Sequence, residues 1–521
     1  MLIKLTILLI FFAVMVAIGL YCRKTASDVN GFVLGGRSVG PWLTAFAYGT
    51  SYFSAVVFVG YAGQFGWKYG IAATWAGIGN ALLGSLLAWV VQGRRTRIMS
   101  QHLDSATMPE FFGKRFGSPS LKVAASVIIF IFLIPYTASL YNGLSRLFGM
   151  AFDIDYTVCV IVMAVLTGVY VIAGGYMATA INDFIQGIIM LFGICAVILA
   201  VLNSQGGFLA ALEGLAQVSD PAVSSAPGVF ASFFGPDPVN LLGVVLLTSL
   251  GTWGLPQMVQ KFYAIKSDKS IDAGTVISTL FALVVAGGCY FLGGFGRLFA
   301  DRMEVVNGVP VGGYDAVIPT MLSGLPDLLM AVVVILVLSA SMSTLSSLVL
   351  TSSSTLTLDL IRDHLVKGMS QKKQVLVMRC LIVVFIAISV VLAIIQYKSN
   401  VTFIAQLMGV SWGALAGAFL APFLYGLYWK KATRAACWTS FLFSTVVMTA
   451  NIFFQASFPA LLRSPINAGA FCMLAGLVLV PVVSLLTPQP DAALVEDAFS
   501  CYDRKVLVRQ REALGDGEKA G

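Results

Sequence analysis

Thirteen long apolar runs constrain the fold of this chain more than any other feature of its sequence. They lie near residues 3–22, 40–64, 70–92, 121–147, 156–174, 182–202, 238–262, 274–297, 326–357, 375–396, 402–428, 435–455 and 467–487. A helix needs about 20 apolar residues to cross the hydrocarbon core of a bilayer. With 58% hydrophobic and only 11% charged residues, the chain has too few charges to cover a soluble globule of 521 residues. We therefore predict an all-α membrane protein with 13 transmembrane helices, in which residues 1–487 form one domain in the lipid bilayer and 488–521 a cytoplasmic tail.

The distribution of basic residues predicts the orientation of these helices. If the N-terminus lies outside, 25 of the 32 Lys and Arg residues fall on the inner side, including Lys261 in the inner segment 261–273. Such an excess is typical of cytoplasmic loops. We expect a multi-pass protein of the plasma (inner) membrane with a cytoplasmic C-terminus. The net charge of +8 then reflects topology, so we infer no nucleic-acid partner and no obligate protein partner.

The sequence does not show the combinations of His, Cys and nucleophilic residues that are typical of enzyme active sites. The only two His residues, His102 and His364, lie in inner loops, and no nucleophile has a base beside it. The eight Cys are scattered without a CxxC pair, which predicts neither a disulfide framework nor a metal cluster. We therefore expect a protein that is not an enzyme and has no cofactor.

The ninth apolar run contains six hydroxyl residues and no charge between Ser339 and Ser347. Residues three and four apart share a helix face, so Ala340, Ser343, Thr344 and Ser347 form one stripe with Ser346 beside it. A hard monovalent cation prefers a shell of neutral oxygens, and this stripe with a freed backbone carbonyl would suit sodium. The alternative is that small hydroxyl residues let helices pack closely, each bonding back to its own helix.

Two spans are interrupted near their middle. The second contains Gly49-Thr50-Ser51-Tyr52-Phe53-Ser54-Ala55, and the seventh contains Gly251-Thr252-Trp253-Gly254-Leu255-Pro256-Gln257. Gly and Pro disfavour a continuous helix and free backbone carbonyls at membrane depth. Each break opens a set of five spans, and because five is odd the second set enters from the opposite side. This predicts a 5+5 inverted repeat (about 40–202 and 238–428) with one helix before it and two after.

The meeting point of the two breaks is the predicted solute pocket. Charged residues are absent from both breaks, so helix N-termini and hydroxyls would have to hold an anionic solute. We expect the pocket to be lined by Ser54, Ala55, Tyr136, Thr252, Trp253 and Gln257.

Asp183 is a carboxylate at the start of a 19-residue apolar stretch, 184–202. An ionisable group at membrane depth indicates a functional site, and we expect it to face Ser343, Ser346 and Ser347. The alternative is that the sixth helix begins at Asn182, with Asp183 in its first turn, where the helix dipole favours a negative charge.

Four motifs together resemble the sodium/solute symporter family of proline, pantothenate, sialic-acid, monocarboxylate and sugar cotransporters. They are Gly35-Gly36-Arg37-Ser38, Asn182-Asp183-Phe184-Ile185-Gln186-Gly187, Gly254-Leu255-Pro256-Gln257 and Met342-Ser343-Thr344-Leu345-Ser346-Ser347. The resemblance implies a LeuT-type fold and sodium as the coupling ion. It implies a main sodium site made by backbone oxygens of Thr50, Phe53 and Ala340 and hydroxyls of Ser343 and Thr344. A second sodium site of some members matches Asp183, Ser343, Ser346 and Ser347.

The substrate is less defined by this resemblance. Where proline transporters have an aspartate in helix 2 and Trp and Tyr in helix 7, this chain has Tyr52, Thr248 and Thr252. The pantothenate and monocarboxylate branches look closer at Gly254-Leu255-Pro256 and Ile318-Pro319-Thr320. We predict a sodium-coupled symporter that imports a small organic solute, such as a carboxylate, an amino acid or a pantothenate-like molecule. The alternatives are a proton-coupled carrier of the same fold and a sensor derived from a transporter.

Overall fold

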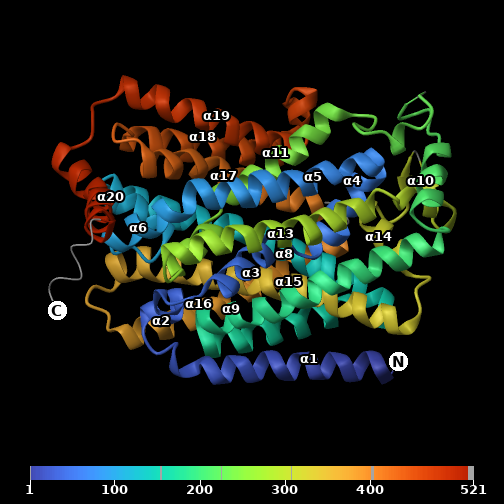
Figure 1. Ribbon diagram of the computed structural model, residues 1–521, viewed down its shortest axis with the longest axis horizontal. Helices are drawn as coiled ribbons and strands as arrows, with labels where there is room; N and C mark the ends of the chain where they lie inside the picture. The colour runs from blue at the N-terminus through green and yellow to red at the C-terminus, as the bar shows by residue number, and fades with distance from the viewer. Residues whose placement is uncertain (1, 153–154, 225, 307, 400–403, 514–521) are drawn as a thin grey trace.

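A computed structural model of the protein describes residues 2–152, 155–224, 226–306, 308–399 and 404–513. It shows a bundle of long helices that run side by side, in which the first helix begins at one end of the bundle and the last helix, residues 492–513, lies at the other (Figure 1). Residues 402–403 of the predicted eleventh span and 514–521 of the predicted tail lie outside the described residues.

Long helices make up most of the chain, and short helical segments connect them. The α-helices are α1 (Leu2–Tyr21), α2 (Val29–Leu34), α3 (Pro41–Tyr52), α4 (Ala62–Tyr69), α5 (Thr74–Gly79), α6 (Arg94–His102), α7 (Met108–Arg115), α8 (Pro119–Phe152), α9 (Tyr156–Ser204), α10 (Phe208–Gln217), α11 (Pro238–Gly254), α12 (Pro256–Ala264), α13 (Asp268–Gly293), α14 (Val317–Leu322), α15 (Asp327–Thr355), α16 (Gln371–Ser399), α17 (Ile404–Tyr428), α18 (Arg434–Phe453), α19 (Pro465–Leu486) and α20 (Ala492–Ala513). Wider π-helical segments cover Val56–Tyr61, Asn80–Leu87, Trp89–Gly93 and Leu356–Leu365. Short 3-10 segments cover Cys22–Lys24, Gly35–Arg37, Gly70–Ala73, Val229–Ala231, Gly296–Arg302, Tyr314–Ala316, Gln455–Ser457 and Ala460–Leu462. The two strands β1 (Val305–Val306) and β2 (Val309–Pro310) form one small antiparallel hairpin.

Ten helical segments of the described chain are long and apolar enough to cross a membrane, or eleven if the bent pair of α11 and α12 counts as one span. Two of them, 56–102 and 156–204, have 47 and 49 residues. At 1.5 Å per residue each is about twice as long as a bilayer core is thick, and each extends over parts of two predicted spans. Gly175 divides α9 with a positive φ of 56°, and a Cβ there would lie 2.8 Å from the Phe32 carbonyl oxygen. The count of thirteen stays a prediction.

Both predicted helix breaks are confirmed. The helix α3 ends at Tyr52, and Phe53 is extended, with φ −85° and ψ 116°. The helix α11 ends at Gly254, Leu255 is extended, and α12 begins at Pro256 with a bend of 45°. Pro256 has no backbone NH and its ring disfavours helical geometry at the preceding residue, which explains why the break occurs there.

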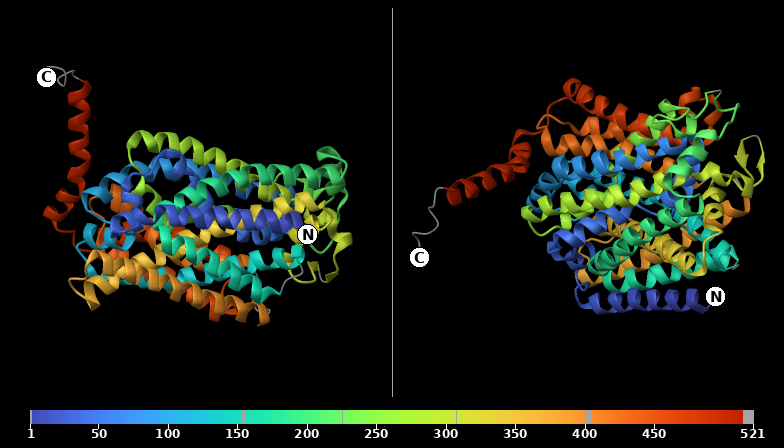
Figure 2. Two further views of the ribbon diagram at one scale, coloured as in Figure 1. Left: turned by 90° about the horizontal axis from the view of Figure 1, so that it is seen from below. Right: turned by 45° about the vertical axis from the view of Figure 1, so that its right-hand side comes forward.

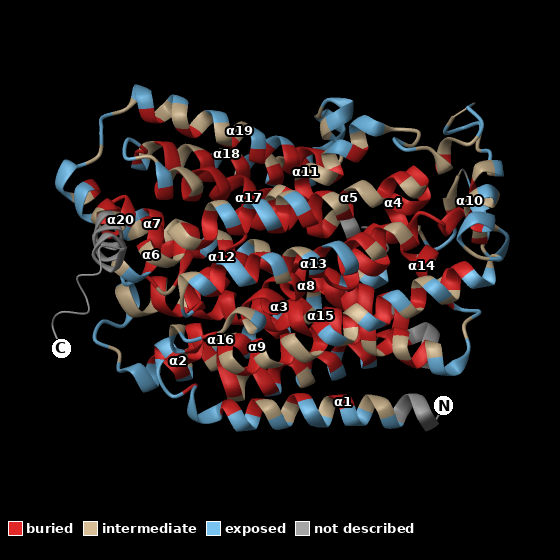
Figure 3. Cartoon of the chain, viewed as in Figure 1, coloured by how far each residue is buried: buried red, intermediate tan, exposed pale blue. Residues whose placement is uncertain are grey.

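The hydroxyl-rich helix α15 lies at the centre of the bundle. It packs against α8, α9 and α16 and also contacts α3 and α12. Every residue from 336 to 355 is buried (Figure 3). In contrast, α1 and α16 have many exposed apolar side chains, as expected for helices that face lipid. The hydroxyls of α15 therefore face protein and not the bilayer.

Two short helices and the tail complete the fold. The short helices α7 and α10 lie between the long ones. Within the tail, α20 is a helix that contacts α6 and α7 and projects from the bundle (Figure 2). The basic segments α6 and α7 lie at this end of the bundle, whereas α10 and α14 lie at the other (Figure 1).

Candidate functional site

The break after α3 leaves backbone oxygens without their usual helical partners. Within the helix, the hydroxyls of Thr50 and Ser51 donate to the carbonyls of residues 46 and 47, at 2.8 and 2.5 Å. Such back-bonding weakens a helix and favours its bending. Because Phe53 leaves the helical region, the carbonyls at the end of α3 point out of the helix and accept bonds from elsewhere.

Helix α15 supplies the donors that meet these carbonyls. The Ser343 hydroxyl donates to the Thr50 carbonyl at 3.2 Å, and the Thr344 hydroxyl lies 3.0 Å from the Thr50 carbonyl and 3.2 Å from that of Phe53. Both hydroxyls also lie 3.1 Å from the Ala340 carbonyl. The five oxygens predicted for the main sodium site are thus brought together.

The chemistry of this group suits a small hard cation. All five residues are buried, their oxygens are neutral, and no cationic side chain makes a hydrogen bond or ion pair to these oxygens in the described part of the chain. A hydroxyl proton can rotate, so Ser343 and Thr344 can each donate to the Ala340 carbonyl of their own helix and turn a lone pair toward an ion. The small-residue packing alternative applies instead to Ser341, whose hydroxyl donates to Val337 at 2.8 Å.

Asp183 lies in the interior, as predicted, but not in a first turn. The helix α9 continues without a break from the kink at Gly175 through Asp183, whose side chain is 0% exposed. The alternative that a helix begins at Asn182 is therefore wrong. Of the expected partners, Ser346 donates to the Ser343 carbonyl at 2.8 Å, and neither Asp183 oxygen has a hydrogen-bond partner among the described residues.

The structure places Lys261 beside Asp183 and Ser347, two residues of the predicted second sodium site. We had counted this residue with the inner loop that follows the seventh span, but it lies inside α12 and is 1% exposed. Its Nζ is 3.0 Å from the Ser347 hydroxyl and 3.9 Å from Asp183 Oδ2. The Ser347 hydroxyl in turn lies 2.9 Å from that of Ser51. The apolar residues around Lys261 in the sequence were the signal that it lies in a helix and not in a loop.

The residues predicted to line the solute pocket divide into two groups. Thr252 donates to the Gly84 carbonyl at 2.8 Å and Trp253 to the Leu83 carbonyl at 2.9 Å, so their polar atoms bind the neighbouring helix. Ala55 packs against Gly143, where an added Cβ would be 3.2 Å away.

The other members keep free polar atoms in the interior. The Ser54 hydroxyl, the Tyr136 hydroxyl and both amide atoms of Gln257 are buried and make no hydrogen bond of ordinary geometry in the described chain, although the Ser54 and Trp412 side chains lie close enough to the Tyr136 hydroxyl to act on it. The indole NH of Trp412 in α17 is likewise buried without a hydrogen bond of ordinary geometry. Its ring packs edge-on against that of Tyr136, with the ring centres 6.0 Å apart. Buried polar groups are rarely left unpaired, so these four side chains are candidates to bind a solute. Sequence reasoning missed Trp412, because only packing brings α17 to the breaks.

A cavity of about 480 Å³ is lined by residues of α4, α11 and α19. The helix α4 lies at the end of the bundle opposite α6 and α20 (Figure 1). The lining of the cavity includes two cations, Lys68 and Arg297, and the carboxylate of Asp237. The Arg297 guanidinium is 3.0 Å from Asp220, and burial lowers the pKa of Arg297 in spite of that carboxylate. This cavity is a polar vestibule on the side opposite α6 and α20.

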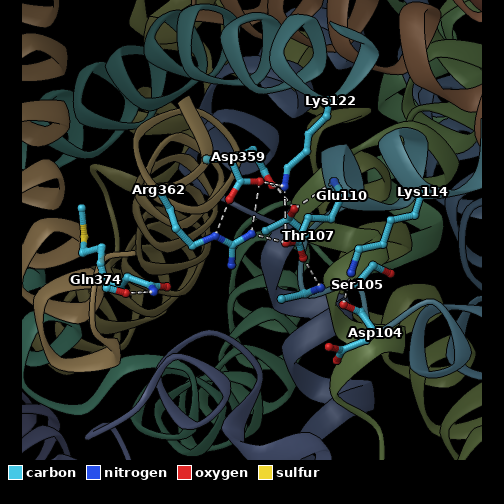
Figure 4. Close-up of polar contacts among 12 residues, drawn as sticks. Asp104, Ser105, Thr107, Glu110, Lys114, Lys122, Asp359, Arg362 and Gln374 are labelled. Carbon is cyan, nitrogen blue, oxygen red and sulfur yellow. Dashed lines mark hydrogen bonds and ion pairs between the residues drawn. The ribbon is translucent and has the colours of Figure 1, made fainter. Parts of the chain in front are cut away.

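At the opposite end, α7, α8 and the π-helical segment Leu356–Leu365 that follows α15 are held together by a charge cluster, which we define as Glu110, Lys122, Asp359, Arg362 and Asp363. Figure 4 shows the first four of them converging with Thr107. Lys122 Nζ lies 3.5, 3.4 and 2.5 Å from the three carboxylates, and Arg362 is 2.7 Å from Glu110. The sequence had assigned these basic residues only to topology.

Comparisons with known proteins agree with this geometry. A profile of the sodium:solute symporter family matches residues 32–443. The osmoregulated proline transporter OpuE of Bacillus subtilis (strain 168) is 29% identical over 426 residues, 81% of this chain and 83% of that protein. The sodium/proline symporter of Staphylococcus aureus (strain JH9) is 29% identical over 516 residues, 96% of each chain. The substrate-bound, outward-open structure of a Na+-coupled sialic acid symporter aligns with a TM-score of 0.72 at 15% identity, over 94% of this chain and 99% of that one. This chain therefore has the same fold as that symporter.

Proposed function

The chain belongs to the sodium:solute symporter family, and we propose that it is a sodium-coupled transporter that carries a small organic solute into the cell by alternating access. The observation that carries the proposal is the convergence of the Ser343 and Thr344 hydroxyls on the carbonyls of the broken helix α3. The family and the relatives are transporters, which points away from an enzyme.

The proposed main sodium site is the group of Thr50, Phe53, Ala340, Ser343 and Thr344. Its oxygens come from two elements, α15 and the end of α3, so a bound ion would hold these elements together. A ligand that binds one arrangement of two elements better than another shifts the population toward that arrangement. Sodium binding would thereby fix the break that borders the proposed solute pocket. An inward movement of one charge contributes about 2.3 kcal/mol per 100 mV of membrane potential.

The proposed solute site consists of Ser54, Tyr136, Gln257 and Trp412, which offer hydroxyl, amide and indole groups but no charge. The two relatives are named for proline, yet the residues Tyr52, Thr248 and Thr252 depart from the proline pattern. We propose a small carboxylate, an amino acid or a pantothenate-like molecule. Its polar groups would satisfy the buried atoms that the protein leaves unpaired, which is how a polar pocket discriminates between solutes.

The purified protein in liposomes tests this function. Uptake of proline, pantothenate, lactate and pyruvate is measured with an inward sodium gradient, with an inward proton gradient without sodium, and with neither. We expect at least one of these solutes to accumulate under the sodium gradient alone, and faster with a negative interior. Accumulation driven by the proton gradient without sodium would contradict sodium coupling. No accumulation of any solute, together with no sodium binding to the purified protein, would contradict the proposed function as a whole.

A further inference from the structure

The residues that match a second sodium site, Asp183, Ser343, Ser346 and Ser347, lie beside a cationic side chain of the protein itself. Lys261 Nζ lies 3.0 Å from the Ser347 hydroxyl, 3.9 Å from Asp183 Oδ2 and 5.1 Å from the centre of the Tyr176 ring. The Lys261 and Asp183 side chains are 2% and 0% exposed. Water therefore does not screen the attraction between the two groups, and a charge left alone there would be costly.

The charges in this group are balanced without a bound ion. Among the described residues, Lys261 is the charged group that interacts electrostatically with Asp183, and Asp183 is the one that interacts with Lys261. One ammonium and one carboxylate cancel. A sodium ion added beside them would give the site a net positive charge in the interior, with only neutral hydroxyls around it.

The oxygen shell is also partly in use. Lys261 donates to the Ser347 hydroxyl, which is 2.9 Å from the Ser51 hydroxyl. Ser346 donates to the Ser343 carbonyl, and the Ser343 hydroxyl lies within hydrogen-bond distance of the Thr50 and Ala340 carbonyls of the proposed main site, at 3.2 and 3.1 Å. Of the set Asp183, Ser343, Ser346 and Ser347, only the carboxylate has no hydrogen bond among the described residues, and the ammonium is its ion-pair partner.

We propose that the ammonium of Lys261 is the resident cation of this second site, that it takes the place of a second sodium ion, and that the protein couples a single sodium ion to each solute. The inference rests on the proposed function and sets the number of sodium ions that are carried with each solute. The contacts of Lys261 in α12 reach Asp183 in α9 and Ser347 in α15, and Ser347 contacts Ser51 in α3. The Lys261 ammonium therefore connects both broken helices, and unlike a sodium ion it is covalently part of the protein and is not released during transport. Each sodium ion contributes its own charge and gradient to the driving force, so with one ion the maximum accumulation of a neutral solute varies with the first power of the sodium ratio, and with two ions it varies with the square.

Counting bound sodium in the purified protein tests the proposal without a known solute. Binding of radioactive sodium ions at saturation gives the number of ions per protein for the wild type, for Lys261→Met and for the double variant Lys261→Met/Asp183→Asn. Lys266→Met is the matched control, because Lys266 follows α12 and is exposed. We expect one ion for the wild type, the control and the double variant. Lys261→Met should bind two ions, because Asp183 then has no internal cation.

The outcomes separate this inference from the function on which it rests. Two ions per wild-type protein would overturn the inference and leave sodium coupling intact, and so would a single ion in a folded Lys261→Met protein. No sodium bound to the wild type would overturn the proposed function and the inference together. If Lys261→Met fails to fold because Asp183 is left unpaired, the wild-type count decides between one ion and two, and a double variant that binds two ions would also refute the proposal.

Discussion

The Thr344 hydroxyl shows what a single atom contributes to the proposed sodium site. It lies within hydrogen-bond distance of three carbonyls, two on the broken helix and one on its own helix. A side chain without this oxygen would keep the backbone ligands but lose one of the two hydroxyls. Ser341 differs: among the described residues, its hydroxyl donates only to the Val337 carbonyl of its own helix.

We therefore expect Thr344→Ala to weaken sodium binding while Ser341→Ala leaves it unchanged. Loss of one buried polar partner costs about 1–3 kcal/mol, which corresponds to a rise of roughly fivefold to 150-fold in the sodium concentration for half-maximal binding. Sodium-dependent thermal stabilisation of the purified variants measures this change. Thr344→Ser should keep most of the affinity, because it retains the oxygen. Equal sodium responses in Thr344→Ala and Ser341→Ala would exclude Thr344 as a ligand.

Among the elements, the short helix α7 is held in place mainly by contacts to charged side chains. It is a helix of 8 residues, capped by the Thr107 side chain, which accepts from the Glu110 NH at 3.1 Å and donates to Asp359 at 2.8 Å. Burial favours the neutral form of Glu110, but Lys122, the Ala106 NH and Arg362 outweigh it and hold the pKa of Glu110 below its ordinary value. As a carboxylate, Glu110 therefore joins α7 to α8 through Lys122 and to the π-helical segment Leu356–Leu365 through Arg362.

The stability that Glu110 contributes should depend on pH. Because its pKa is lower in the folded protein, the contribution is present above the ordinary Glu pKa of about 4.3 and is lost as the pH falls through the lower, folded value. At neutral pH, Glu110→Gln should cost about 1.5–3 kcal/mol, typical of hydrogen bonds to charged groups. Thermal unfolding between pH 7 and pH 3 should show the gap between wild type and variant closing at the acid end. The exposed Glu213 of α10 supplies the control Glu213→Gln, for which no gap is expected at any pH; a constant gap for Glu110→Gln would refute the ionised role.

At the scale of the whole molecule, the two ends of the bundle differ in chemistry. The charge cluster, α6 and α20 lie at one end, and the polar vestibule of about 480 Å³ lies at the other, with the N-terminus (Figure 1). Termini at opposite ends require an odd number of crossings, in keeping with the predicted thirteen. The excess of basic residues in the loops of the first end favours its placement in the cytoplasm.

Cysteine labelling in intact cells tests this orientation. Val223 lines the vestibule and Lys367 lies between α15 and α16; both are exposed. A membrane-impermeant maleimide should label Val223→Cys in intact cells and Lys367→Cys only after the membrane is opened. The parent protein with its eight native cysteines gives the background, and the reverse labelling pattern would invert the topology.

The sequence by itself determined the features that depend on local chemistry. Apolar runs predict membrane helices because lipid offers no hydrogen bonds, and the breaks at Phe53 and Leu255 follow from Gly, hydroxyl residues and Pro256 close to them. The stripe of Ala340, Ser343 and Thr344 follows from helical periodicity. These predictions need only residues within a few positions of one another.

Tertiary structure decided which distant side chains meet. Lys261 is 86 positions from Ser347, and although the apolar residues around Lys261 indicate a helix, they do not show which distant side chains it meets. Thr252 and Trp253 were expected to face the solute, but the packing of α11 against the 80–87 segment directs their polar atoms to carbonyls there. The rotation of a helix about its axis is set by the neighbours against which it packs, so the direction of each side chain, and with it the occupant of each site, is decided only when the bundle assembles.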